Sequence, residues 1–167
     1  MLCSSPKSFF VFILAATLLP GAAPAQPNLP GQFPAAGGIS PPTQCAVENG
    51  NCSFSGARTV IYGVEGKFSQ PHVAVDGIPC NNGVFGDPAV GTGKACFLAG
   101  EELQRCAVEN GRCSFTGLRT VAYGARYSFN TKTAAGGIDC NNGTFGDPLV
   151  GTGKACYLLP SSIPGAP

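Results

Sequence analysis

Residues 45–63 read CAVENGNCSFSGARTVIYG, and residues 106–124 read CAVENGRCSFTGLRTVAYG. Further along, CNNGVFGDPAVGTGKAC at residues 80–96 returns as CNNGTFGDPLVGTGKAC at residues 140–156. Near-identity at a fixed spacing marks an internal repeat. The chain therefore contains a tandem duplication, with repeat 1 at residues 44–98 and repeat 2 at residues 105–159.

The spacing between the copies changes once. Cys45 and Cys106 are 61 positions apart (106 − 45), whereas Cys80 and Cys140 are 60 apart (140 − 80). One residue has therefore been gained or lost between Gly66 and Asp76. Because a surface loop tolerates such a change better than a core strand does, we expect a loop in this segment.

The segment before the repeats has the order of a secretory signal peptide. Lys7 precedes an apolar run from Phe9 to Leu19, and Ala23-Pro24-Ala25 forms a small-residue cleavage site. An uncleaved anchor is the alternative, but the run is shorter than the roughly 20 residues that span a bilayer. We expect export, either to the extracellular space or to the periplasm of a Gram-negative bacterium. The expected organisation is a signal peptide at 1–25, a flexible Pro/Gly/Ala-rich leader at 26–43, repeat 1, a linker at 99–104, repeat 2 and a tail at 160–167.

Cysteine count and charge narrow the class of protein. Of nine cysteines, Cys3 falls in the expected signal peptide, so eight remain, an even number typical of disulfides in a short exported chain. Removal of Lys7 leaves nine basic side chains against nine acidic ones, so no excess of positive charge favours nucleic acid or an anionic membrane. No C-x-x-C pair occurs and His72 is the only histidine, which argues against zinc. We expect no metal and no cofactor.

Turn signals and short β-forming runs dominate each repeat. Asn-Gly is the preferred pair of a two-residue hairpin turn, and it occurs at Asn49-Gly50 and Asn82-Gly83, then again at Asn110-Gly111 and Asn142-Gly143. No window shows a sustained helical period. The sequence predicts an all-β chain of two small disulfide-stapled modules, each with four or five short strands and Asn-Gly hairpins.

The hairpin interpretation constrains the disulfides. If Asn49-Gly50 is a two-residue loop, Cys45 lies diagonally from Cys52, about 7 to 8 Å away and too far for an unstrained bridge. Two connectivities then remain in each repeat, and we favour the nested one because it brings the ends of the unit together. It pairs Cys45 with Cys96, Cys52 with Cys80, Cys106 with Cys156, and Cys113 with Cys140.

Candidate ligand-binding residues recur in both copies. Tyr62 stands before a glycine, which would leave one face of its ring open for a sugar or a peptide, although a half-buried tyrosine with a capped hydroxyl fits the pattern equally. Arg58, Asn82 and Asp87 are its candidate polar partners. Because Asp87 precedes a proline, holding an Asx turn is the alternative role for its carboxylate. The counterparts in repeat 2 are Tyr123, Arg119, Asn142 and Asp147.

The sequence carries no recognisable catalytic motif. The recurring carboxylates Glu48 and Asp87 could form a glycosidase pair, but a unit this small has little room for a substrate cleft. Pairing with Arg58 or Lys94 is the favoured role for both. No G-x-S-x-G, P-loop or H-E-x-x-H string occurs. The sequence therefore predicts a binding protein and not an enzyme.

The pattern C-A-x-E-x-G-x-C-x-F-x-G-x-R-x-V-x-Y-G, then C-x-N-x-x-F-G-D-P and G-x-x-K-x-C, resembles a small cysteine-rich β module of secreted microbial proteins. The resemblance covers residues 45–98 and 106–158. Such modules are often found in tandem or attached to polysaccharide-active enzymes, which implies carbohydrate as the ligand. With two copies, it implies bivalent binding of extracellular or cell-wall carbohydrate through equivalent sites. A structural or protein-interacting secreted factor, such as an envelope component, adhesin or inhibitor, is the alternative.

Overall fold

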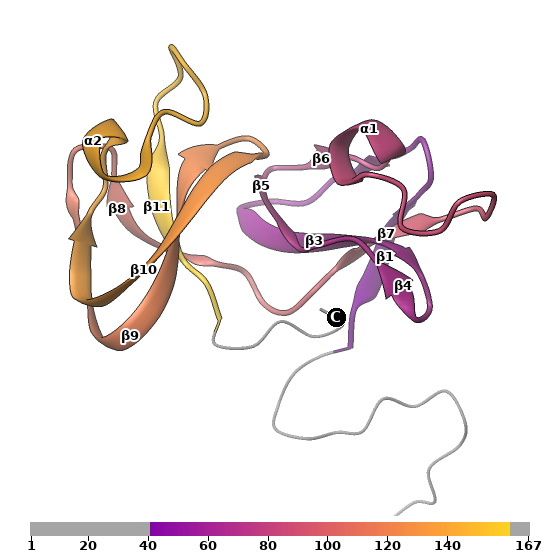
Figure 1. The fold of residues 1–167 in the computed structure, drawn as a ribbon, viewed down its shortest axis with the longest axis horizontal. Helices are drawn as coiled ribbons and strands as arrows, with labels where there is room; N and C mark the ends of the chain where they lie inside the picture. The colour runs from indigo at the N-terminus through magenta and orange to yellow at the C-terminus, as the bar shows by residue number, and fades with distance from the viewer. Residues whose placement is uncertain (1–40, 161–167) are drawn as a thin grey trace, which may run out of the picture. The chain divides into compact units, whose positions relative to one another are not determined.

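The computed structural model describes residues 41–160 (Figure 1). Strands dominate these residues, and every strand pairing in them is antiparallel. The fold is therefore all-β, as the sequence predicts. The expected signal peptide, most of the expected leader and the tail beyond Pro160 lie outside the described residues.

Repeat 1 contains seven strands and one helical turn: β1 (Thr43–Val47), β2 (Asn51–Cys52), β3 (Ala57–Val64), β4 (Lys67–Phe68), β5 (His72–Val75), β6 (Ile78–Pro79), α1 (Asn82–Phe85) and β7 (Ala95–Leu98). Five strands form one sheet in the order β1-β7-β3-β4, in which β5 also pairs with β3. The remaining strands, β2 and β6, form a two-stranded sheet.

Repeat 2 builds a related layout from fewer and longer strands: β8 (Gln104–Val108), β9 (Arg112–Ala125), β10 (Ser128–Asp139), α2 (Asn142–Phe145) and β11 (Ala155–Leu158). They form one sheet in the order β10-β9-β11-β8. The long pair β9 and β10 runs where repeat 1 has β2 to β6 (Figure 1). The predicted four or five short strands are thus wrong for repeat 1, which has seven. Repeat 2 has four strands, as predicted, but β9 and β10 are long and not short.

The one-residue length difference lies at residues 69–71, a short bulge without strand structure between β4 and β5, within the segment predicted to contain a loop. Gly63 pairs with Phe68, and Val60 pairs with His72. Between these two pairs, residues 61–62 of β3 lie opposite three residues, 69–71. In repeat 2 the corresponding pairs run without interruption along β9 and β10. Ser69 in the bulge is buried, and its hydroxyl accepts a hydrogen bond from the Tyr62 N–H (3.2 Å). Pro71 cannot donate to the ladder, which helps to break the strand there.

The first Asn-Gly pair of each repeat does not form the predicted hairpin. Asn49 has a left-handed φ of 66°, and the Gly50 N–H closes the turn on the Val47 carbonyl (3.0 Å). The strands on either side nevertheless diverge, because β1 pairs with β7 and β2 pairs with β6. Asn110 in repeat 2 has the same φ of 66°.

The second Asn-Gly pair is helical. The Asn81 side chain accepts a hydrogen bond from the Val84 N–H and caps α1, so that Asn82-Gly83 becomes its first turn; Asn141 caps α2 in the same way. Asparagine is among the preferred residues at a helix N-cap as well as in turns. The hairpin prediction overlooked this competing role.

The disulfides join near neighbours, so the predicted nested pairing is wrong. Repeat 1 has Cys45–Cys52 and Cys80–Cys96, and repeat 2 has Cys106–Cys113 and Cys140–Cys156. The nested pairing assumed that β1 and β2 face each other as a hairpin. Because they do not, the turn brings the Cα atoms of Cys45 and Cys52 to 5.0 Å, within the usual range for a bridge. Four disulfides are typical of extracellular proteins.

Each repeat has its own apolar core. Tyr62, Phe85 and the buried cysteines lie at the centre in repeat 1, and their counterparts form the core of repeat 2. A third cluster draws on both repeats and includes Leu103, from the segment predicted as a linker. The Leu103 N–H donates to the Ala57 carbonyl (2.7 Å), so this segment is packed against β3. The described residues all belong to one compact unit.

Candidate functional site

The exposed positions that are identical in the two repeats are concentrated in two segments. In repeat 1 these are the turn at residues 47–49 and the loop at residues 82–93, and in repeat 2 they are residues 108–110 and 142–153. Between residues 65–79 and 126–139, by contrast, every exposed position differs. We call the two segments of each repeat its retained face.

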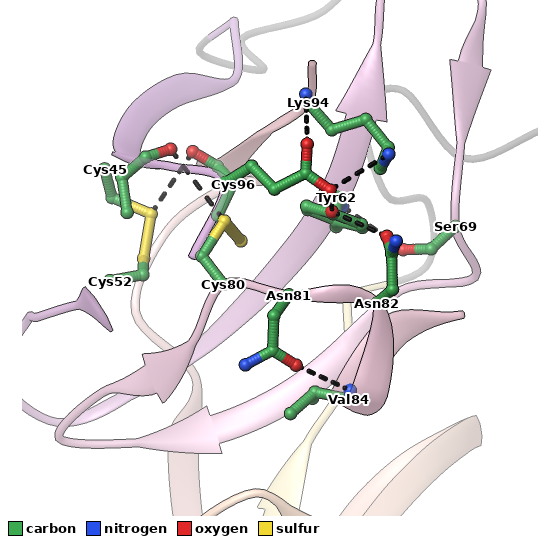
Figure 2. The surroundings of a disulfide bond; sticks show 12 residues. Cys45, Cys52, Tyr62, Ser69, Cys80, Asn81, Asn82, Val84, Lys94 and Cys96 are labelled. Carbon is green, nitrogen blue, oxygen red and sulfur yellow. Dashed lines mark hydrogen bonds and ion pairs between the residues drawn. A yellow bond between two sulfur atoms is a disulfide. The ribbon is translucent and has the colours of Figure 1, made fainter. Parts of the chain in front are cut away.

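A disulfide closes each segment of the retained face at its base. Cys45–Cys52 brackets the turn that carries Glu48, and Cys80–Cys96 brackets the loop that carries Asn82 and Asp87. Figure 2 shows both bridges beside the Tyr62 hydroxyl and the capped turn of α1. Groups held in this way lose little conformational freedom when they bind a partner.

Lys94 ties the two segments together. Its side chain is only 3% exposed, and its Nζ lies 3.0 Å from Glu48 Oε1 and 3.2 Å from Asp87 Oδ1. The ammonium also donates to the Thr92 carbonyl (2.9 Å), and these three contacts use all of its protons. Because the Lys94 N–H donates to Glu48 Oε2 (3.1 Å) as well, the turn and the loop form one unit.

Tyr62 lies beneath this ion cluster. Its side chain is 0% exposed and stacks on Phe85 with a centroid separation of 5.3 Å. Its hydroxyl lies 2.6 Å from Glu48 Oε1 and 2.8 Å from Asn82 Oδ1. A hydroxyl has one proton, and the shorter contact with the charged carboxylate is the stronger of the two. The prediction of an open ring face is therefore wrong for Tyr62 and also for Tyr123, which is buried in the same way.

Repeat 2 reproduces the cluster with closely similar distances. The Tyr123 hydroxyl lies 2.6 Å from Glu109 Oε1 and 2.7 Å from Asn142 Oδ1. Lys154 Nζ lies 3.2 Å from Glu109 Oε1 and 3.2 Å from Asp147 Oδ1. The retained face is thus built twice on the same internal scaffold.

The contacts shift the pKa values of Glu48, Lys94 and Tyr62 in directions that keep Glu48 and Lys94 charged and Tyr62 neutral near neutral pH. The hydrogen bond from Tyr62, followed by those from Lys94, lowers the pKa of Glu48. Burial alone would lower the pKa of Lys94, but its bonds to Glu48 and Asp87 outweigh burial and raise it. Burial, reinforced by the bond to Glu48, raises the pKa of Tyr62 to about 12. The cluster therefore contains two carboxylates, one ammonium and a neutral phenol.

Of the other predicted site residues, Asp87 and Asn82 join the cluster and Arg58 does not. Asp87 Oδ1 accepts a hydrogen bond from the Ala89 N–H (3.2 Å), which confirms its turn-forming alternative, and its Oδ2 lies 3.4 Å from Asn82 Nδ2. Arg58 instead donates to the Gly100 carbonyl (2.8 Å), and Arg119 donates to the Leu159 carbonyl (3.2 Å).

The predicted pairing of Glu48 and Asp87 with Lys94 is confirmed. The sequence analysis did not, however, place Glu48 and Lys94 among the candidate ligand-binding residues, although they hold the centre of the site. The signal that could have placed them there was their recurrence as Lys154 and Glu109. An ionisable side chain kept in both copies of a duplicated unit is a candidate for a shared network.

The solvent-facing part of the retained face contains polar side chains and two exposed valines in each repeat. The side chains of Glu48 and Asp87 are 22% and 32% exposed, and Asn82 is exposed. Val47 is 64% exposed and Val90 is 84% exposed, and their counterparts Val108 and Val150 are 59% and 83% exposed. The face can therefore offer carboxylate and carboxamide groups to hydroxyls, beside a small apolar surface.

Within residues 41–160, no group of three or more His, Cys, Asp or Glu side chains is arranged to hold a metal ion. The same residues contain no helix with the length and apolar character needed to cross a membrane. Neither a protein-family model, nor a curated protein, nor a solved structure matches this chain.

Proposed function

We propose that the protein is exported and binds extracellular or cell-wall carbohydrate through the retained faces of its two repeats, without catalysing a reaction. The observation that carries this proposal is the retention of the same exposed residues, on the same disulfide-closed scaffold, in both repeats. Core residues recur in a duplicated unit because packing requires them. Asn82 and Asp87 also have a structural role, because they contact Tyr62 and Lys94. The exposed side chains of Val47 and Val90 have no such requirement, so their recurrence favours a shared ligand.

The chemistry of the face suits a neutral polyhydroxylated ligand. Carboxylate and carboxamide oxygens accept hydrogen bonds from hydroxyl groups, and an exposed valine can contact the apolar face of a sugar ring. Because the face offers few contacts, we expect each site to bind weakly. Two such sites on one chain gain avidity on a repeating polymer without any new contact.

The state of the carboxylates supports binding over catalysis. A glycosidase acid must hold a proton near neutral pH, which requires a raised pKa. The pKa of Glu48 is lowered, and both Glu48 and Asp87 are engaged by Lys94. Neither carboxylate is therefore poised as a general acid.

The proposal is tested by pull-down on insoluble polysaccharides and by a glycan array, using the exported protein. Val90→Ser and Val150→Ser each replace the more exposed valine of one retained face, and we expect each to weaken binding and the double variant to abolish it. Leu118→Ser is the matched control, because Leu118 is 72% exposed but lies outside the retained face. Failure of the wild-type protein to bind any glycan, or an equal loss in Leu118→Ser, would reject the proposal.

The four exposed valines favour a second candidate, a protein partner that docks on the retained faces. Exposed aliphatic tips recurring at equivalent positions are typical of a contact surface between proteins. Under this alternative the same two valine variants lose a protein partner while glycan binding is absent in the wild type. A crosslinking experiment on the exported protein, with wild type and the double variant compared, separates the two candidates.

A further inference from the structure

A pocket of about 250 Å³ lies apart from the retained faces, and aromatic and aliphatic groups form much of its wall. Its lining includes the rings of Tyr127 and Phe129, together with Val73 and Leu159. None of the described residues that line it is Lys, Arg, Asp or Glu. A charged occupant would lose hydration there without gaining an opposite charge, so the pocket suits an uncharged and largely apolar group.

The wall of the pocket belongs to the third apolar cluster, the one that draws on both repeats. Val73, Phe129 and Leu159 line the pocket and are also members of that cluster. Leu103 belongs to the same cluster and is 6% exposed. The pocket therefore opens from a region that is otherwise packed with apolar side chains.

The linker after repeat 1 supplies one of these packed side chains. As the chain leaves β7, the Ala99 N–H donates to the Thr59 carbonyl (2.9 Å). Four positions later, the Leu103 N–H donates to the Ala57 carbonyl (2.7 Å), and the Leu103 side chain enters the third cluster. A short segment that follows the last strand of a repeat can thus contribute an aliphatic residue to this region.

Repeat 2 begins the same exit but cannot continue it along the same path. The Leu159 N–H donates to the Thr120 carbonyl (2.9 Å), as its counterpart does in repeat 1. The next residue in repeat 1, Gly100, has a φ of 78°, whereas its counterpart Pro160 is restricted to a φ near −65°. The path of the linker is therefore closed to the segment after Pro160. In agreement, Leu118 is 72% exposed, although its counterpart in repeat 1 is buried beneath the linker.

The segment after Pro160 starts at the wall of the pocket and has a matching chemistry. Leu159 lines the pocket, so the following residues begin beside it. Residues 161–167 read SSIPGAP and carry no charged side chain, which suits the uncharged lining. Ile163 is their one large aliphatic residue and follows Leu159 by four positions, so at most about 14 Å of chain separates the two. Because a tethered side chain has a high effective concentration, even a weak contact is enough to hold it.

We infer that the pocket receives the side chain of Ile163, so that the segment after repeat 2 packs against the third cluster as the linker does after repeat 1. The pocket is smaller than the roughly 300–1,000 Å³ of a drug-sized site, which fits one aliphatic side chain. The Ile163 methyl groups then contact the rings of Tyr127 and Phe129. This contact uses no residue of the retained faces, so it does not depend on the proposed carbohydrate binding.

The direct test is NMR of the oxidised protein with isotope-labelled isoleucine methyl groups. We expect ring currents to shift the Ile163 methyl signals upfield, and we expect NOEs from these methyl groups to Tyr127 and Phe129. A sample that mixes labelled and unlabelled chains distinguishes the chain's own segment from that of a second copy. Ile163 methyl signals at random-coil positions, or NOEs that arise only between chains, overturn the inference.

Thermal unfolding of variants supplies a second readout. Because Ile163→Ser withdraws an apolar group from the pocket, it should lower Tm by roughly 3–6 °C, whereas Ile163→Leu should keep most of the wild-type value. Ala166→Ser is the matched control in the same segment and should leave Tm unchanged. Thr131 is exposed and lines the pocket, so Thr131→Trp should fill it and move the Ile163 methyl signals to random-coil positions in a folded protein. Equal Tm values for Ile163→Ser and wild type overturn the inference.

Discussion

Replacement of Tyr62 by phenylalanine tests the physical basis of the retained face. Tyr62→Phe keeps the buried ring and its stacking on Phe85, and removes only the hydroxyl that lies 2.6 Å from Glu48 Oε1. A hydrogen bond to a charged group contributes about 1.5–3 kcal/mol, and no large cavity is left. We therefore expect the free energy of unfolding to fall by about 2 kcal/mol, which corresponds to a Tm lower by roughly 5–10 °C.

The assay is denaturant unfolding at several pH values, followed by circular dichroism. The loss should be greatest near neutral pH and shrink in acid, because protonation of Glu48 removes the charge that strengthens the bond in the wild type. Tyr123→Phe should show a similar loss, since its hydroxyl also lies 2.6 Å from a glutamate oxygen. Tyr127→Phe is the control, because Tyr127 is partly exposed. If Tyr62→Phe unfolds at the same denaturant concentration as Tyr127→Phe, the hydroxyl does not stabilise the retained face and the reasoning fails.

Three further predictions concern the ion cluster and the disulfides. The pKa of Glu48 is lowered from 4.5, so its contribution to stability is present above pH 4.5 and is lost as the pH falls through the lowered value. The pKa of Lys94 is raised from 10.5, so its contribution is present below pH 10.5 and is lost as the pH rises through the raised value. The denaturation midpoint should thus be highest between these limits, and a midpoint that rises below pH 4 would contradict the ion cluster. For the disulfides, separations of 7 and 16 residues predict that removal of Cys45–Cys52 costs about 2.4 kcal/mol and removal of Cys80–Cys96 about 3.1 kcal/mol, measured as double Cys→Ala variants. Peptide mapping under non-reducing conditions should recover these neighbour pairs, and recovery of a Cys45–Cys96 peptide would refute the connectivity.

The two Asn-Gly pairs of repeat 1 show where local sequence signals predicted the wrong structure. Asn82-Gly83 is one of four Asn-Gly pairs that predict a hairpin, yet it forms the first turn of a helix that Asn81 caps. Asn49-Gly50 does make a turn, but its flanking strands pair elsewhere, and that choice of partner also decided the disulfides. A turn signal describes four residues. Which strands pair depends on contacts between segments far apart in the chain, which no local pattern contains.

The sequence predicted some residues of the candidate site correctly and misplaced others. Recurrence in the two copies correctly selected Asn82 and Asp87, because a shared network requires the same residues in both. It also selected Arg58, which lies outside the cluster, and it could not tell that the Tyr62 ring is buried. Burial depends on what packs against a side chain, and Tyr62 in β3 is covered by Phe85 of α1, 23 positions further along the chain (85 − 62).

The sequence by itself determined the duplication, the all-β class and the set of residues that both copies keep, because periodicity, turn-forming residues and recurrence are written along the chain. Only the tertiary structure decided the pairing of the cysteines, the burial of Tyr62 and the central place of Lys94. It alone also showed that Thr59 faces a valine where its counterpart faces a threonine. These features depend on distances between residues brought together from separate segments, and such distances are fixed only when the strands have found their partners.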